Sequence, residues 1–267
     1  MVWDFLSILT LVVIAMGCFI LFDNYYQRRY KTILPSIKQE GIVHYSLYKK
    51  IQNNVRQFFP MLLIVLVIRA FIAQPFRVPT GSLEPTVLPG DMIIVTQFNY
   101  GLRSPIFLHK LLPLGEPKRG DIAVFHWPSD IQYHFVKRVI GLPGDHIEYH
   151  NKVLTVNGQE WEQKDKGEGE AYDEPGSPHH TVMVREEQLP QGSHKVFIDP
   201  NILGSDFDVT VPKNNYFVMG DNRDHSDDSR YWGFLPEKDL VGKANFVLLS
   251  WDNETWRIRW SRTGKVL

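Results

Sequence analysis

Two apolar runs near the N-terminus dominate the hydrophobic pattern of the chain. Phe5–Phe22 extends for 18 residues without a charged side chain, and Phe58–Ala73 is a shorter run that contains Pro60 and Arg69. At about 1.5 Å per residue the first run spans about 27 Å, enough to cross a bilayer. Arg69 lies near the far end of the second run, where its side chain can reach the headgroups. The pattern predicts transmembrane helices at 5–22 and 58–76, with a buried or interfacial helix as the alternative for the second.

The segment between the two runs predicts how they are oriented. Residues 23–57 hold seven Lys and Arg residues against two acidic residues. Positively charged loops stay in the cytoplasm, so residues 1–4 and everything after the second helix should lie on the extracytoplasmic side. A cleaved signal peptide is the alternative for the first run. It is disfavoured because no Lys or Arg precedes Phe5, whereas a signal peptide normally begins with a positive region.

Short β-type runs separated by turn residues follow residue 76. They are Met92–Gln97, Ile122–Trp127, Tyr133–Ile140, His146–His150, Val153–Val156, Lys195–Ile198, Phe207–Val211, Tyr216–Met219 and Ala244–Trp251. Asn157-Gly158 follows an alternating run, as in a tight hairpin. Because no long amphipathic helical pattern interrupts these runs, we expect a mostly β fold: an antiparallel β-sheet domain anchored by two N-terminal transmembrane helices. Residues 159–212 begin with a stretch rich in Glu, Asp, Gly and Pro, which predicts a loop-rich β insertion between core parts 77–158 and 213–267.

Charge is distributed unevenly along the 267 residues. Eight of the 29 Lys and Arg residues and three of the 30 Asp and Glu residues precede position 74, which leaves 21 basic and 27 acidic side chains and a net charge of −6 for the remainder. A domain this acidic, without a stripe of basic residues, is a poor candidate for binding nucleic acid. Cys18 is the only cysteine, so the chain forms no intrachain disulfide.

Three tryptophans near the C-terminus, Trp251, Trp256 and Trp260, allow two interpretations. They could pack in the core, or they could lie at the membrane interface, where aromatic residues are enriched. We expect core packing. Membrane lipid is an expected partner in either case, because of the two apolar helices.

Ser82, a few residues beyond the second apolar run, is the candidate nucleophile. A serine is weak until a base removes its proton, and histidine is the usual base. Ser82 does not lie in a Gly-x-Ser-x-Gly segment, and none of the ten histidines has an obvious Asp partner. His179-His180 and the pair His146 and His150 could bind a metal, but neither pair has a convincing third ligand. We therefore expect no metal site and no cofactor.

Lys137 is the stronger candidate for the base. Alternation along Tyr133–Ile140 puts Lys137 on the same strand face as Phe135 and Val139. If that face is buried, desolvation lowers the pKa of the lysine, and the neutral amine can take a proton from Ser82. The alternative places Lys137 on an exposed face, with Arg138 pointing inward.

Three segments together carry a resemblance to a known enzyme family. They are Pro79-Thr80-Gly81-Ser82-Leu83-Glu84-Pro85-Thr86, Lys137-Arg138-Val139-Ile140-Gly141-Leu142-Pro143-Gly144-Asp145 and Gly220-Asp221-Asn222-Arg223-Asp224-His225-Ser226-Asp227-Asp228-Ser229-Arg230-Tyr231-Trp232-Gly233. In this order, after a two-helix anchor with a basic loop, they resemble bacterial type I signal peptidases (leader peptidases). The resemblance covers residues from about 74 to 158 and 214 to 250. It implies a serine endopeptidase of the inner membrane, with its catalytic domain in the periplasm, that removes signal peptides from exported preproteins.

The resemblance also implies a role for each matching residue of the reaction centre. Ser82 would attack the scissile carbonyl, and Lys137 would act as general base and then as general acid. The backbone N–H of Ser82 and the hydroxyl of Thr80 would donate to the oxyanion. The family often has Ser at the position of Thr80. Threonine keeps the hydroxyl but stiffens the side chain.

Other matching residues would support the dyad or hold the substrate. Ser226 would orient the lysine ammonium, and Asp228 and Arg230 would form a supporting ion pair, although side chains in such a turn-rich segment often only cap their own backbone. The family cuts after small residues at the first and third positions before the bond, the Ala-x-Ala rule. The walls of the matching pocket would be Phe76, Val78, Pro79, Leu83, Phe135 and Val136, with ordinary core packing as the alternative for each. An extended substrate would pair as a strand beside the Ser82 segment.

Two other functions compete with the peptidase. A self-cleaving repressor shares the Ser/Lys chemistry but needs an N-terminal DNA-binding domain, where this chain has membrane helices. A membrane-anchored β scaffold could bind exported chains without cutting them, although a scaffold has no need of a lysine on an apolar face. The expected partners are preprotein signal peptides and membrane lipid, with proximity to the protein export machinery.

Overall fold

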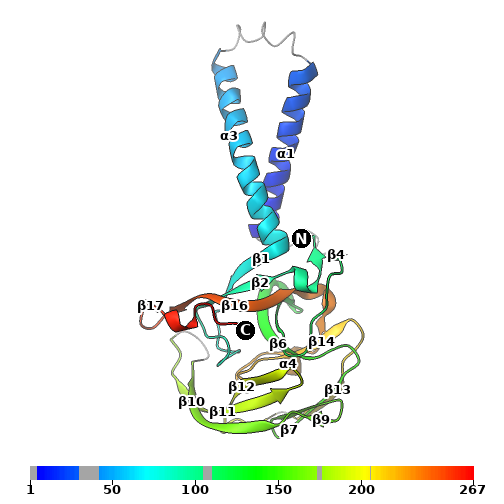
Figure 1. Ribbon diagram of the computed structural model, residues 1–267, viewed down its shortest axis with the longest axis vertical. Helices are drawn as coiled ribbons and strands as arrows, with labels where there is room; N and C mark the ends of the chain where they lie inside the picture. The colour runs from blue at the N-terminus through cyan, green and yellow to red at the C-terminus, as the bar shows by residue number, and fades with distance from the viewer. Residues whose placement is uncertain (1–4, 30–41, 105–109, 173–175, 205) are drawn as a thin grey trace. The chain divides into compact units, whose positions relative to one another are not determined.

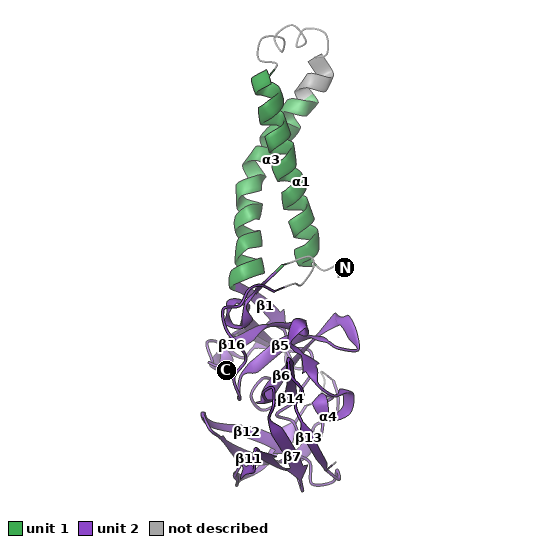
Figure 2. Ribbon diagram, turned by 90° about the vertical axis from the view of Figure 1, so that its right-hand side faces the viewer, with its two compact units in different colours: residues 1–72, 104–107 green, residues 73–103, 108–267 purple. Residues whose placement is uncertain are grey.

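The computed structural model describes residues 5–29, 42–104, 110–172, 176–204 and 206–267. The chain divides into two compact units (Figure 2): residues 1–72 with 104–107, and residues 73–103 with 108–267. The expected N-terminal segment 1–4 and residues 30–41 of the expected basic loop lie outside the described residues.

The first unit consists of two helices (Figure 1), which contact each other through a cluster of apolar side chains. Helix α1 spans Phe5–Arg29, and α3 spans Ile42–Val67 and continues as one π-helical turn, Ile68–Ile72. Leu9 and Val13 of α1 pack against Leu66 of α3. Both helices are long and apolar enough to cross a membrane, as the sequence predicts.

The helices extend well into the segment 23–57, which the sequence predicts as a loop. Asp23 belongs to α1 and is only 1% exposed. Its carboxylate accepts hydrogen bonds from Tyr48, from Gln52 at 2.6 Å and from Arg56 at 2.8 Å, all on α3. The polar side chains of one helix therefore satisfy the acid of the other, and helical pairing continues past the apolar runs.

The second expected helix, 58–76, extends too far at its C-terminal end. Ala73–Arg77 forms strand β1, paired antiparallel with β2 (Asp91–Thr96). Pro75 has no N–H to continue a helix and restricts the residue before it. A proline is tolerated in an edge strand, and β1 lies at one edge of the main sheet.

The second unit is built on antiparallel sheets, which confirms the mostly β expectation (Figure 1). The main sheet has the order β1-β2-β16-β5-β6-β14-β15, with β17 paired to β16. Its further strands are β5 (Ile122–Trp127), β6 (Asp130–Gly141), β14 (Asn215–Met219), β15 (Leu235–Pro236), β16 (Leu240–Asp252) and β17 (Arg257–Ile258). Strands that are distant in sequence are thus neighbours, which brings the Ser82 and Lys137 segments into one sheet system.

Three smaller sheets complete the described part of this unit. Their strands are β3 (Leu102–Arg103) with β4 (Lys110–Leu112); β13 (Phe207–Thr210), β7 (His146–His150), β8 (Val153–Val156) and β9 (Gln159–Glu160); and β10 (Gln163–Ala171), β11 (His180–Leu189) and β12 (Gly192–Ile198). The last sheet is more regular than the loop-rich insertion expected at 159–212. Strand β10 is polar and mostly exposed, so its sequence has no apolar alternation that would predict a strand. It is held in the sheet by backbone pairing with β11.

Strand β6 joins the hydrophobic clusters of this unit. Val136 packs in a cluster with Val78 and Leu83, whereas Phe135 and Val139 pack in another with Phe125. Burying both faces of this strand fixes its register, because a slip by one residue would exchange every side chain between the faces. The backbone of Lys137 is held accordingly.

Candidate active site

Ser82 lies in a compact turn that joins β1 to β2. The N–H groups of Glu84 and Thr86 donate to the carbonyls of Gly81 and Leu83, both at 2.9 Å. Leu83 is 1% exposed and Val87 is fully buried in the core. These apolar anchors hold the turn on the sheet and leave Ser82 half-buried, at the wall of a cleft.

Lys137 is buried in the middle of β6, with 4% exposure. Its Nζ lies 5.7 Å from the centre of the Phe135 ring, as expected for two residues on the same strand face. Burial lowers the pKa of Lys137 from 10.5 to about 8, although the negative charge of Asp228 partly opposes the shift. Arg138 is also buried. Lys137 and Arg138 therefore both point into the protein, whereas the sequence predicted that only one of the two would.

Ser82 and Lys137 line the same cleft, whose volume is about 470 Å³. Thr80 and all six residues predicted as pocket walls line it too: Phe76, Val78, Pro79, Leu83, Phe135 and Val136. The remaining lining residues, which sequence reasoning did not assign to the site, are Arg77, His134, Ser177, His225 and Asp227. The candidate nucleophile Ser82, a lysine with a lowered pKa and an apolar wall thus line one cleft.

The loop that follows β14 packs directly against the Ser82 turn. The N–H of Asn222 donates to the Ser82 carbonyl at 3.1 Å, and its side-chain amide donates to the Gly81 carbonyl at 3.3 Å. A Cβ at Gly220 would lie 2.3 Å from the Ser82 carbonyl oxygen and 2.2 Å from Ser226 Oγ. Only glycine fits at this position, because its backbone passes so close to both serines.

Ser226, Asp228 and Arg230 form one buried group beside Lys137. The Ser226 hydroxyl donates to Asp228 Oδ2 at 2.8 Å, and Arg230 donates to both Asp228 oxygens, each at 2.8 Å. Burial alone would raise the pKa of Asp228, but the hydrogen bonds and charge of Arg230 lower it. Asp228 also caps the short helix α4 (Ser229–Trp232). It therefore keeps a buried negative charge near Lys137 while it also caps its own backbone.

A second buried ion pair, which the sequence analysis missed, connects all three motifs. Arg138 donates to Asp221 at 2.7 and 2.6 Å, and the Thr86 hydroxyl donates to the same carboxylate at 2.5 Å. Burial alone would raise the pKa of Asp221, but the charge of Arg138 brings it down to about 2. Thr86, Arg138 and Asp221 each lie in a different one of the three quoted motifs. The sequence shows these polar and charged residues, but only the fold shows that they contact one another.

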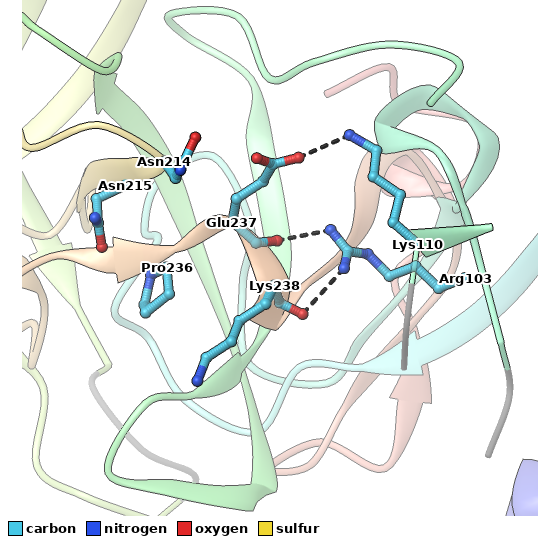
Figure 3. Close-up of a pocket in the computed structure, with 7 residues that line it drawn as sticks. All are labelled: Arg103, Lys110, Asn214, Asn215, Pro236, Glu237 and Lys238. Carbon is cyan, nitrogen blue, oxygen red and sulfur yellow. Dashed lines mark hydrogen bonds and ion pairs between the residues drawn. The ribbon is translucent and has the colours of Figure 1, made fainter. Parts of the chain in front are cut away.

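A separate pocket of about 530 Å³ lies against β4 and β15 (Figure 3). Arg103 donates to the carbonyls of Glu237 and Lys238 at 2.6 and 3.1 Å, and Lys110 donates to the Glu237 carboxylate at 2.7 Å. Its basic groups thus hold β3 and β4 to the 3-10 helix Glu237–Asp239, which follows β15. None of the candidate catalytic residues lines this pocket, whereas Ser82 and Lys137 both line the other cleft.

Comparisons with known proteins agree with this geometry. Residues 51–251 match the family model for signal peptidase, peptidase S26. Signal peptidase I of Pseudomonas aeruginosa is 42% identical over 209 residues, covering 73% of this chain and 72% of its own. Signal peptidase I of Pseudomonas fluorescens is 40% identical over 218 residues, with the same two coverages, and that of Buchnera aphidicola (subsp. Baizongia pistaciae) is 36% identical over 251, covering 79% and 80%. The chain therefore belongs to the signal peptidase family, peptidase S26, and is a serine endopeptidase.

Proposed function

We propose that this membrane-anchored peptidase cuts N-terminal signal peptides from exported preproteins after an Ala-x-Ala-like site, with Ser82 as nucleophile and Lys137 as general base. One observation carries the proposal: Ser82 shares an apolar cleft with a buried lysine whose pKa is lowered to about 8. A lysine with this pKa is partly neutral near physiological pH, and a neutral amine can accept the serine proton.

The reaction follows from these groups in two halves. Lys137 Nζ takes the proton of Ser82 Oγ as Oγ attacks the carbonyl carbon, and the tetrahedral oxyanion accepts from the Ser82 N–H and the Thr80 hydroxyl. The C–N bond then breaks, and the Lys137 ammonium gives its proton to the leaving amine, which is the new N-terminus of the exported protein. Water, deprotonated by Lys137, next attacks the ester between Ser82 and the signal peptide. The ester C–O bond then breaks, the signal peptide leaves as a carboxylate, and the Lys137 ammonium returns the proton to Ser82 Oγ.

The cleft walls support a preference for small side chains. Val78 is 4% exposed and Leu83 is 1% exposed, and both belong to the same core cluster. Walls that are part of a packed core cannot move aside for a bulky residue. Alanine side chains at the first and third positions before the cut fit such shallow apolar pockets, whereas larger ones would overlap the walls.

The Thr80 hydroxyl provides a separate test of the oxyanion donors. Replacing Thr80 by valine keeps the shape and removes the donor, so kcat should fall by about 10²- to 10³-fold. Thr80→Ser keeps the hydroxyl and should retain most of the activity. Both variants would be measured with an Ala-x-Ala peptide substrate at saturation. An unchanged kcat in Thr80→Val would show that another group stabilises the oxyanion.

The pH dependence tests the proposed base. Because only the neutral amine accepts the proton, kcat/KM should rise with pH, with a midpoint at about 8, and level off above it. The measurement is peptide cleavage between about pH 6 and about pH 10, at constant ionic strength. A midpoint near 6.5, the ordinary pKa of histidine, would instead point to an imidazole base.

Membrane attachment is proposed through both units. The two apolar helices would anchor the chain in the inner membrane, with the basic segment 23–57 in the cytoplasm and the catalytic unit in the periplasm. Trp256 and Trp260 are 77% and 70% exposed, contrary to the core packing expected from the sequence. Exposed tryptophans are favourable at a lipid interface. These residues are therefore candidates for contact with membrane lipid, close to where exported chains leave the export machinery.

A further inference from the structure

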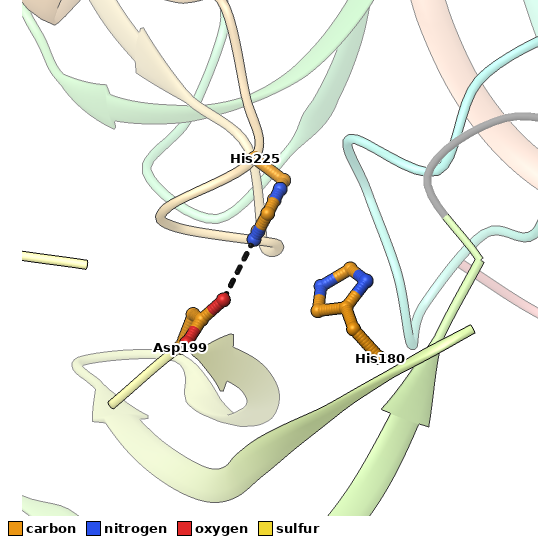
Figure 4. Close-up of side chains that lie close together, drawn as sticks. All are labelled: His180, Asp199 and His225. Carbon is orange, nitrogen blue, oxygen red and sulfur yellow. Dashed lines mark hydrogen bonds and ion pairs between the residues drawn. The ribbon is translucent and has the colours of Figure 1, made fainter. Parts of the chain in front are cut away.

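We propose that His180, Asp199 and His225 form a binding site for a divalent transition-metal ion, with Zn²⁺ as the expected occupant (Figure 4). One ligand atom from each residue lies within 4.8 Å of the other two. His180 begins β11, Asp199 directly follows β12, and His225 directly precedes Ser226. The sequence shows no third ligand for the pair His179-His180. The fold places Asp199 and His225 beside His180, whereas His179 is not part of the group.

The distances fit one ion with little rearrangement. Ligand atoms around a tetrahedral Zn²⁺, bound at 2.0–2.1 Å, lie about 3.3 Å apart. His225 Nε2 and Asp199 Oδ2 are already 3.1 Å apart. The His180 and His225 rings have centroids 4.3 Å apart, and the His180 ring faces the other two side chains (Figure 4). The His180 ligand atom lies within 4.8 Å of the other two, so a rotation of its side chain that shortens these distances would complete three ligands around one ion.

The donor set is typical of transition metals. Two imidazoles and one carboxylate bind Zn²⁺ or Fe²⁺, whereas Mg²⁺ and Ca²⁺ prefer oxygen ligands alone. Three protein ligands also leave at least one coordination position open for water or another small ligand. The proposed site therefore differs from a closed structural zinc centre.

Hydrogen bonds from neighbouring groups hold the carboxylate in place. Asp199 is 7% exposed, and its Oδ1 accepts from the Asn201 N–H at 2.8 Å, which leaves Oδ2 toward His225. The Asp199 N–H donates to Asp224 at 2.8 Å, and Lys152 donates to the same Asp224 oxygen at 2.9 Å. Such outer contacts orient metal ligands and increase affinity.

An ion at this position would link the β10–β11–β12 sheet to the loop that follows β14. His180 and Asp199 belong to the β10–β11–β12 part of the chain, whereas His225 lies in the loop that carries Ser226 and also lines the Ser82 cleft. Ion binding should therefore stabilise the folded state and raise the melting temperature of the protein.

Two other histidine clusters provide controls. His179 precedes His180 but contacts Glu254 at 3.0 Å and Glu170 at 3.7 Å. His146 contacts Glu148 at 3.2 Å and Asp208 at 3.3 Å. Each cluster has one histidine and two exposed or half-buried acids, so each should bind a transition metal more weakly than a site with two histidines.

The test is zinc binding to the full chain, purified in detergent without a histidine tag and stripped of metal. Equilibrium dialysis against ZnCl₂, followed by elemental analysis, should give one zinc per chain for the wild type and for His179→Gln and His146→Gln. His180→Gln and His225→Gln should lose this stoichiometric binding and the zinc-dependent rise in melting temperature. Circular dichroism would check that all four variants are folded.

Cobalt provides a second readout. Co²⁺ bound through two imidazoles and a carboxylate should give visible absorption bands that His180→Gln and His225→Gln lack. The proposal is overturned if the wild type binds no stoichiometric zinc, or if His180→Gln binds zinc as well as His179→Gln does. Neither measurement uses peptide cleavage, so the outcome does not depend on the proposed Ser/Lys mechanism.

Discussion

Replacing Ser82 by alanine should lower the rate of cleavage by about 10³- to 10⁶-fold, the range expected when a protease loses its nucleophile. Alanine removes only the hydroxyl from a half-buried side chain, and the turn around it is held by Leu83 and Val87. The variant should therefore keep the melting temperature of the wild type and still bind preprotein. Single-turnover cleavage of an Ala-x-Ala peptide and a binding titration would measure the two properties separately.

A matched control separates the nucleophile from other hydroxyls at the cleft. Ser177 also lines the cleft but lies outside the three motifs, and Ser177→Ala should cleave at a rate close to that of the wild type. If Ser82→Ala retained more than about a tenth of the wild-type rate, which is a change of less than about 1.4 kcal/mol in barrier, Ser82 could not be the nucleophile.

Lys137→Met should reduce cleavage as severely as Ser82→Ala, because Lys137 is the proposed base for Ser82. It should also remove the rise in activity around pH 8. The two losses should not add in the double variant, since the proposed mechanism makes the serine and the lysine act as one unit. The wild type and Lys137→Met should differ most in cleavage rate at high pH, because the wild-type lysine is then neutral.

The same variant should be more stable than the wild type at neutral pH. The folded state lowers the pKa of Lys137 from 10.5 to about 8, so it binds fewer protons than the unfolded state between these two values. The free energy of unfolding of the wild type should therefore rise with pH across that window. Below the window, the free-energy cost of burying the charged lysine is fully present. It amounts to on the order of 3 kcal/mol. Methionine removes the penalty and fills a similar volume.

Denaturant unfolding at about pH 7 and about pH 10 measures this effect. Lys213→Met is the control, because Lys213 is exposed in a turn of the second unit and should change neither activity nor the pH slope. A Lys137→Met variant that is less stable than the wild type, or that keeps the wild-type pH slope, would contradict the description of Lys137 as a buried, partly neutral lysine.

Local patterns predicted much of the fold. The strands Ile122–Trp127, His146–His150 and Val153–Val156 have the same bounds in the structure as in the sequence prediction, because turn residues delimit these three β-type runs. The polar strand β10 could not be found in this way, since its regularity comes from backbone pairing with β11. Similarly, the helical extension through Asp23 depends on side chains from α3.

The candidate site shows the same limit. The three motifs predicted Ser82, Lys137 and the Ser226–Arg230 segment as site residues, because each motif is a short continuous run that the sequence displays directly. The Arg138–Asp221 pair and the group of His180, Asp199 and His225 depend on long-range packing, which residue spacing does not reveal. The burial of Arg138 beside a buried Lys137 was also unexpected, because an alternating strand usually has one polar face.

Cleavage of a preprotein tests the central claim most directly. Detergent-purified wild type, Ser82→Ala and Lys137→Met would each be incubated with a preprotein that carries one Ala-x-Ala site, and the products mapped by mass spectrometry. The account predicts a single cut directly after that site by the wild type alone. Preprotein binding without a cut by any of the three proteins would contradict it and would favour the non-catalytic scaffold.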